Sequence, residues 1–166
     1  NNKDALVRSV QEIVRFPSVE APAAGPGAPF GEAVRGALEN ALNLGKSFGF
    51  ETTNLDGYAG CIDYGCGEEM LGVVAHVDVV PEGEGWIHPP YAAEIADGRI
   101  YGRGTMDDKG PAVCAIYALA AIKAAGIPMR RRVRIILGTN EETGWGCMDH
   151  YRKVAEIPTL TFSPDA

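Results

Sequence analysis

The chain has 166 residues, which is enough for one domain with a hydrophobic core. Its 46% hydrophobic and 22% charged residues are typical of a globular protein and exclude a disordered or membrane-embedded one. The net charge of −7 argues against a surface for nucleic acid or anionic membranes. No apolar run approaches the about 20 residues of a membrane span, and the N-terminus lacks a signal-peptide core, so we expect a cytoplasmic protein.

The first half of the chain predicts two helices followed by two short strands. Apolar residues recur three or four positions apart in both helices, and Asp56-Gly57 is a turn signal between the strands. The expected elements are a helix over Asp4–Phe16, a Pro/Gly/Ala-rich loop over Ala21–Pro29, a helix from Val34 that closes around Gly45–Gly49, and strands over Glu51–Leu55 and Cys61–Tyr64.

In the second half, strands alternate with helices. The expected elements are a buried strand over Leu71–Ala75, a hairpin over Tyr91–Tyr101, a helix over Pro111–Ala125, a buried strand over Val133–Gly138, a helix over Cys147–Val154 and a strand over Thr159–Phe162. This alternation predicts an α/β fold whose sheet is largely parallel or mixed, with helices on both faces.

Residues that can bind a metal ion or transfer a proton follow four of the expected strands. They are His76 and Asp78 after Leu71–Ala75, Asp107 and Asp108 after Ile100–Gly104, Glu141 and Glu142 after Val133–Gly138, and Asp165 after Thr159–Phe162. In α/β sheets, sites form beyond the carboxyl ends of the strands. So much converging negative charge is unfavourable without a cation, and histidine with carboxylates suits zinc or a similar metal. The number of ligand-type residues exceeds one tetrahedral site, which favours two ions that share a carboxylate.

Each part of this cluster also has an ordinary structural explanation. A single H-x-D pattern is common by chance, and Asp107-Asp108 could cap the following helix. Glu141-Glu142 could be charges on an exposed loop, and Asp165 could belong to a turn. The position of all these residues after consecutive expected strands favours the metal site.

Five ordered motifs resemble one known family. They are AHVDVVP, GW-x-x-x-PY, DGRIYGRGTMDDKG, GTNEETG and SPDA. The chain resembles the dinuclear zinc peptidases, the family of carboxypeptidase G, the aminoacylases, acetylornithine deacetylase, succinyl-diaminopimelate desuccinylase and the bacterial PepV-type Xaa-His dipeptidases. The resemblance extends from about Phe16 to the end and is densest from Leu71 onward.

The resemblance implies roles for the residues around His76. His76 and Asp165 are expected to be ligands of one metal ion. Asp78 is expected behind His76, where its carboxylate fixes the imidazole, and a spacing of two on extended chain puts both on one side. Asp107 is expected to bridge both ions, and in this family the peptide bond that follows this aspartate is cis.

The two adjacent glutamates are expected to have different roles, because neighbouring side chains point in different directions in extended chain. The resemblance implies that Glu142 is a ligand of the second ion and that Glu141 is the general base. Glu141 would take a proton from a metal-activated water and deliver it to the leaving amine. The implied cofactors are two divalent ions, zinc first, with manganese or cobalt as alternatives.

The segments AHVDVVPEGEGW, GTNEETGWGCMDHY and PTLTFSPDA most resemble the PepV-type dipeptidases, so we expect hydrolysis of the amide bond of dipeptides. An aspartate at position 165 is typical of peptidases in the family, whereas many of its deacetylases have glutamate there. The alternatives are an amidohydrolase or deacetylase of N-acyl amino acids, a non-catalytic metal-binding remnant, and an acidic flavodoxin-like binding module without metal.

The catalytic domain of this family continues well beyond the length of this chain. It contains a lid domain, often dimerising, and a further histidine ligand. We therefore expect residues 1–166 to be the N-terminal part of a catalytic domain that is nearly inactive alone, with a homodimer through the lid as one option. His88 is expected in a loop and His150 on the surface, and neither matches the motif of the further ligand.

Overall fold

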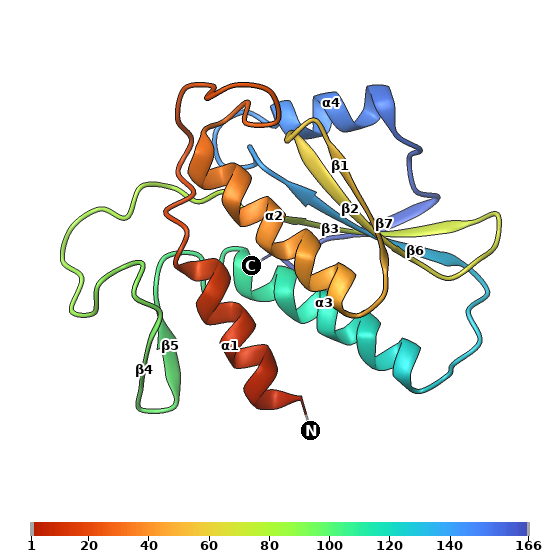
Figure 1. Ribbon diagram of the computed structural model, residues 1–166, viewed down its shortest axis with the longest axis horizontal. Coiled ribbons are helices and arrows are strands. Elements are labelled where there is room, and N and C mark those ends of the chain that lie inside the picture. Colours follow the sequence, from red (N-terminus) through yellow and green to blue (C-terminus); the bar gives the residue numbers. More distant parts are fainter. Residues whose placement is uncertain (1, 166) are drawn as a thin grey trace.

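A five-stranded sheet forms the centre of the computed structural model, which describes residues 2–165 (Figure 1). Its strands in spatial order are β1 (Glu51–Leu55), β2 (Ala59–Tyr64), β6 (Arg132–Gly138), β3 (Met70–His76) and β7 (Leu160–Phe162). β3 is parallel to β6 and β7, whereas β2 is antiparallel to β1 and β6. The α/β fold is confirmed, and of the two expected arrangements the sheet is mixed rather than largely parallel.

Helices cover both faces of the sheet, as expected (Figure 1). The helices α1 (Lys3–Val14), α2 (Glu32–Ser47) and α3 (Lys109–Ala124) share the large core on one face, and α4 (Gly146–Val154) packs on the other. Because successive strand residues point to opposite faces, Ile135 belongs to the large core and Ile136 to the small one beneath α4. None of the helices within residues 2–165 has the length and apolar run needed to cross a membrane.

The expected hairpin is present but does not join the central sheet. Its strands, β4 (Glu94–Ala96) and β5 (Arg99–Tyr101), pair only with each other among the described residues. Asp97 and Gly98 both have positive φ, of 49° and 73°, which is the geometry of a two-residue hairpin turn. The expectation that Asp107 and Asp108 follow a strand of the central sheet is therefore wrong, because the strand before them, β5, belongs to the two-stranded sheet. Asp108 is the N-cap residue of α3, and Asp107 directly precedes it.

The parallel pairing of β3 with β6 brings two chain segments to the same sheet edge. His76, the last residue of β3, is opposite Gly138, the last residue of β6. Beyond this pair, the Val77 amide still donates to the Gly138 carbonyl oxygen at 2.9 Å. The residues that follow each strand are therefore held side by side.

The segment after α1 forms hydrogen bonds with the residues that follow β3. Ser18 is fully buried, its Oγ donates to the Val77 carbonyl oxygen at 2.6 Å, and its carbonyl oxygen accepts from the Val79 amide at 3.0 Å. These bonds fix the backbone on which Asp78 lies.

Ser18→Ala is expected to lower the free energy of unfolding by about 1–3 kcal/mol, because the buried Val77 carbonyl loses its side-chain donor. Ser47→Ala is the matched control. The Ser47 hydroxyl bonds the Leu44 carbonyl at an exposed position, so its loss should change stability by less than about 0.5 kcal/mol. Denaturant unfolding of the full-length protein measures both values, and equal effects would contradict the role given to Ser18.

Candidate metal centre

His76 lies at the centre of a group of carboxylates. It is 2% exposed at the end of β3. Its Nε2 lies 3.0 Å from Asp107 Oδ1, 3.7 Å from Asp165 Oδ2 and 4.0 Å from Glu141 Oε2. Carboxylates from three other segments of the chain thus converge on one imidazole nitrogen.

The other imidazole nitrogen faces Asp78. Nδ1 of His76 lies 3.0 Å from the Asp78 carbonyl oxygen and 3.4 Å from Asp78 Oδ1. Asp78 is 1% exposed, and its Oδ2 accepts from the Glu142 amide at 3.1 Å. Asp78 therefore contacts both the histidine and the loop after β6, and these contacts orient the imidazole with Nε2 toward the carboxylates.

Two overlapping groups of side chains have the spacing of metal ligands. One consists of His76, Asp107 and Glu142, and the other of His76, Asp108 and Asp165; within each group the ligand atoms lie within 4.8 Å of one another. Imidazole nitrogen with carboxylate oxygen is a donor set that suits zinc and similar divalent ions. All the sequence-predicted ligands lie in these groups.

The charges in the cluster shift the pKa values of its members. Burial lowers the pKa of His76, but the hydrogen bond to Asp78 and the charges of Asp78, Asp108 and Asp165 outweigh it and raise the pKa to about 9. Burial raises the pKa of Asp108 to about 7, against the opposing effect of the hydrogen bond from His76. Burial and the charge of Asp107 also raise the pKa of Glu142. A bound cation would offset the repulsion between the carboxylates of Asp107, Asp108, Glu142 and Asp165.

Asp108 is a member of the cluster that sequence reasoning left without a metal role. It is fully buried at the N-cap position of α3, but its side chain makes no capping bond. Instead, Oδ2 accepts from the His76 amide at 3.0 Å, and among the described residues Oδ1 has no hydrogen-bond partner. A buried carboxylate oxygen without a donor fits a cation site. The peptide bond between Asp107 and Asp108 is cis, as the family resemblance implies.

Lys109 is a second buried charge that the sequence did not reveal. Its side chain is fully buried, and Nζ donates to the Phe16 carbonyl oxygen at 2.7 Å. Burial lowers its pKa to about 7, while the charge of Asp78 opposes this shift. A lysine at the start of a helix is ordinarily exposed, so no sequence signal marked it.

Glu141 belongs to neither ligand group. It lines a cavity of about 480 Å³ together with His76 and Asp165, and 31% of its side chain is exposed. Glu142 turns the other way, and its Oε1 accepts from the Val80 amide at 3.3 Å. The neighbouring glutamates therefore offer one carboxylate to the cavity and one to the ligand group.

The two other histidines lie elsewhere. His88 Nδ1 pairs with Glu94 Oε2 at 2.7 Å, and its ring stacks on Tyr101. His150 Nε2 lies 3.3 Å from Asp56 Oδ2, and its ring stacks on Tyr58.

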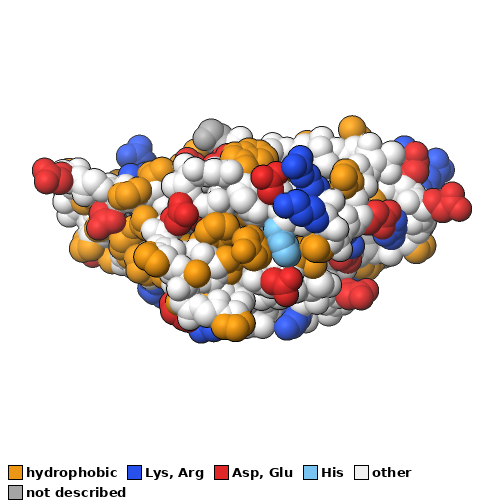
Figure 2. Space-filling model, turned by 90° about the horizontal axis from the view of Figure 1, so that it is seen from above, with side chains coloured by type: hydrophobic (Ala, Val, Ile, Leu, Met, Phe, Trp, Pro, Cys, Tyr) orange, Lys and Arg blue, Asp and Glu red, His pale blue; other side chains and the backbone are white. Residues whose placement is uncertain are grey.

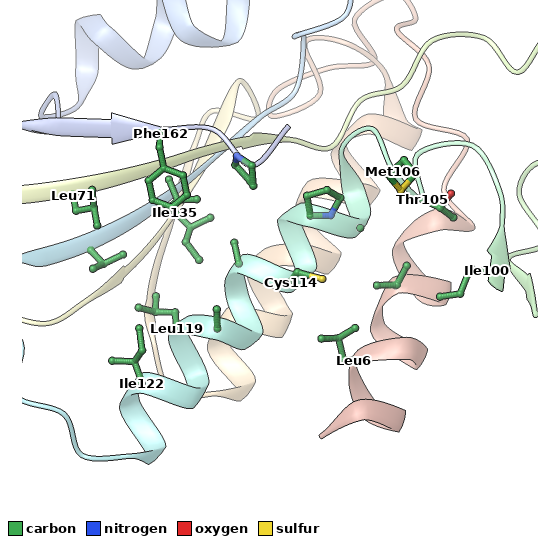
Figure 3. A pocket seen from close by; sticks show the side chains of 18 residues that line it. Leu6, Leu71, Ile100, Thr105, Met106, Cys114, Leu119, Ile122, Ile135 and Phe162 are labelled. Atoms are coloured by element: carbon green, nitrogen blue, oxygen red, sulfur yellow. The ribbon is translucent and has the colours of Figure 1, made fainter. Parts of the chain in front are cut away.

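A larger cavity, of about 720 Å³, lies between α1, α3 and the sheet (Figure 3). Leu6 of α1, Leu119 and Ile122 of α3 and Phe162 of β7 surround it, and among residues 2–165 no acid, histidine, lysine or arginine lines it.

A buried histidine among carboxylates at the edge of a mixed α/β sheet defines a protein with a candidate divalent-metal centre. The model of Peptidase family M20/M25/M40 matches residues 72–166, more than half of the chain, and the chain belongs to this family. The family resemblance of the motifs is confirmed.

Relatives of similar sequence support the same assignment. The chain is 52% identical to "Putative dipeptidase YtjP" of Bacillus subtilis over 99% of this chain and 36% of that protein. It is 42% identical to "Beta-Ala-Xaa dipeptidase" of Lactobacillus delbrueckii subsp. lactis, again over 99% of this chain and 35% of that protein. The chain thus spans about a third of the length of these relatives.

The fold is similar to that of part of human carnosine dipeptidase 1, with a TM-score of 0.76 and 23% identity over 92% of this chain and 35% of that one. It also matches the M20 family metallo-carboxypeptidase Sso-CP2 of Sulfolobus solfataricus, with a TM-score of 0.78 and 17% identity over 97% of this chain and 37% of that one.

Proposed function

We propose that this chain supplies most of the metal ligands and the general base of a peptidase site that hydrolyses dipeptides. The observation that carries the proposal is the convergence of Asp107, Glu141 and Asp165 on Nε2 of the buried His76. The proposed ligands are His76, Asp107, Glu142 and Asp165, and the number of carboxylates in the two ligand groups, which exceeds one tetrahedral site, supports a pair of divalent ions. Zinc suits the donor set first, with manganese or cobalt as alternatives.

When bound, the ions would supply an activated water and polarise the scissile carbonyl. In this proposal Glu141 takes a proton from the attacking water and returns it to the leaving amine. Its place in the cavity beside His76 supports this role. Asp78 keeps His76 in the orientation that points Nε2 toward the other ligands.

Dipeptides are the proposed substrates because the relatives at 52% and 42% identity both carry dipeptidase names. An aspartate rather than a glutamate at position 165 favours a peptidase over a deacetylase of N-acyl amino acids. We further propose that residues 1–166 are the N-terminal part of the catalytic domain, with a lid domain and a further ligand in the remaining length that the relatives have. The isolated 166-residue chain is then expected to be nearly inactive.

Removal and return of metal test the proposal. We expect the full-length protein to lose dipeptide hydrolysis after a chelator has removed its metal and the chelator itself has been removed. Without metal there is neither an activated water nor a polarised carbonyl. Titration with zinc, manganese or cobalt should restore it, with activity levelling off near two ions per chain. Full hydrolysis by the metal-free protein would contradict the mechanism, and saturation at one ion would contradict the pair.

A further inference from the structure

The cavity beside Glu141 has one polar end and one apolar wall. His76, Glu141 and Asp165 form the polar end, and Val74, Trp145 and Met148 contribute to the wall. Its volume of about 480 Å³ lies in the range of small-molecule sites, which combine apolar walls with a few polar groups. Seen from the side on which α4 lies, the surface likewise presents hydrophobic side chains next to acidic ones (Figure 2).

Trp145 is the most unusual member of the wall. Its φ of 59° places it in the left-handed region, and 52% of the residue is exposed. For a bulky residue this backbone conformation is an outlier that costs about 1–3 kcal/mol. Neither the strain nor an exposed indole stabilises the part of the fold that the structure describes, so packing within residues 2–165 does not explain a tryptophan at this position.

The loop that carries Trp145 is held in shape by Asn140, which is 5% exposed. The Trp145 amide donates to the Asn140 carbonyl oxygen at 2.7 Å, and the Gly146 amide donates to Asn140 Oδ1 at 3.0 Å. Asn140 Nδ2 in turn donates to Thr143 Oγ1 at 2.6 Å. The same short loop contains Glu141, so the indole is fixed relative to the carboxylate that we propose as the base.

Met148 and Val74 complete the wall from two other elements. The terminal methyl group of Met148 lies close to Gly138, since an added Cβ on that glycine would meet it at 3.3 Å. Val74 of β3 also lines the cavity and is half-buried. The wall therefore includes side chains from β3, α4 and the loop before α4, and Phe162 of β7 also lines the cavity.

We propose that Trp145 and Met148 form a subsite that binds the apolar side chain of one residue of the dipeptide substrate. This inference rests on the proposed function, because the subsite adjoins the groups assigned to peptide hydrolysis. An aliphatic or aromatic side chain of the substrate lies against the indole of Trp145 and the thioether of Met148. The scissile amide of the substrate then lies next to Glu141. Trp145 is thus a specificity-determining residue, and it has no part in proton transfer.

Steady-state kinetics of the full-length, metal-loaded protein test the subsite. The substrates are two dipeptide series, X-Ala and Ala-X, with glycine, alanine, leucine or phenylalanine at X. In one series, Trp145→Ala is expected to lower kcat/KM for the leucine and phenylalanine substrates by about 10-fold or more, and for the glycine and alanine substrates by less than about threefold. Met148→Ala should act in the same direction, and Trp145→Phe should keep most of the preference.

Trp86→Ala is the matched control. Trp86 is an exposed tryptophan in a different cavity, stacked under Arg103, and its loss should leave the preference unchanged. A uniform loss of kcat/KM over all substrates in Trp145→Ala, or an unchanged preference with a lowered Tm, would overturn the subsite and make the indole a packing residue. Either result would leave the proposed function unaffected. The proposed function would be contradicted if the full-length, metal-loaded protein hydrolysed none of the dipeptides.

Discussion

Glu141→Gln is expected to lower kcat for dipeptide hydrolysis by about 10²- to 10⁴-fold in the full-length protein, the range that a positioned general base contributes. Glutamine has the shape of glutamate but cannot accept the proton of the attacking water. Metal content should stay unchanged, because Glu141 belongs to neither of the two ligand groups. Steady-state kinetics and metal analysis of the same preparation measure both quantities.

The neighbouring glutamate provides the contrast. Glu142→Gln is expected to lower metal content as well as turnover, since Glu142 belongs to the group with His76 and Asp107. Glu156→Gln is a surface control, because Glu156 pairs with Arg132 in an exposed ion pair away from the cluster. Wild-type turnover in Glu141→Gln would exclude Glu141 as the base, and loss of metal from it would make it a ligand.

The sequence predicts the part of the site that depends on local patterns. The uninterrupted apolar runs of β3 and β6 mark buried strands, and the ends of neighbouring parallel strands meet at one sheet edge. The positions of His76 and of Glu141 follow from that rule alone. α1 and α2 follow from apolar periodicity, and α3 follows from Pro111 near its first turn and Gly126 at its end. The bounds of the helices differ only by a few residues from those expected.

The remaining features depend on contacts between distant segments. Asp107 reaches His76 from the start of α3, not from a strand of the sheet, and no local pattern distinguishes a hairpin that pairs alone from one that joins the sheet. Lys109 is buried because the Phe16 carbonyl, 93 residues away in sequence, lies at its ammonium group. The left-handed backbone of Trp145, in contrast, depends on hydrogen bonds within its own loop, to Asn140. Such contacts appear only once the chain has folded.

His76→Ala is expected to have the largest effect on metal binding, since His76 lies at the centre of both ligand groups. Loss of an outer-shell partner costs about 10- to 100-fold in metal affinity, and loss of a direct ligand should cost more. Asp78→Asn, which alters the partner behind the imidazole, should fall within that 10- to 100-fold range. Calorimetric titration of the metal-free full-length protein with zinc measures both.

The two other histidines are matched controls for this change. His88 and His150 are each engaged with a carboxylate and an aromatic ring outside the cluster. His88→Ala and His150→Ala should therefore keep wild-type zinc affinity. A loss in either variant as large as that in His76→Ala would place a ligand outside the cluster and contradict the assignment.

The pH dependence of zinc binding separates a ligand from a structural histidine. In the metal-free protein the pKa of His76 is raised to about 9, so the imidazole is charged at pH 7 and must lose a proton to bind metal. Zinc affinity should therefore rise with pH, with a contribution of up to about tenfold per pH unit from this proton, and this contribution should vanish above pH 9. In His76→Ala the same contribution should be absent, whereas His88→Ala and His150→Ala should retain it. A slope that survives in His76→Ala would show that another group releases the proton.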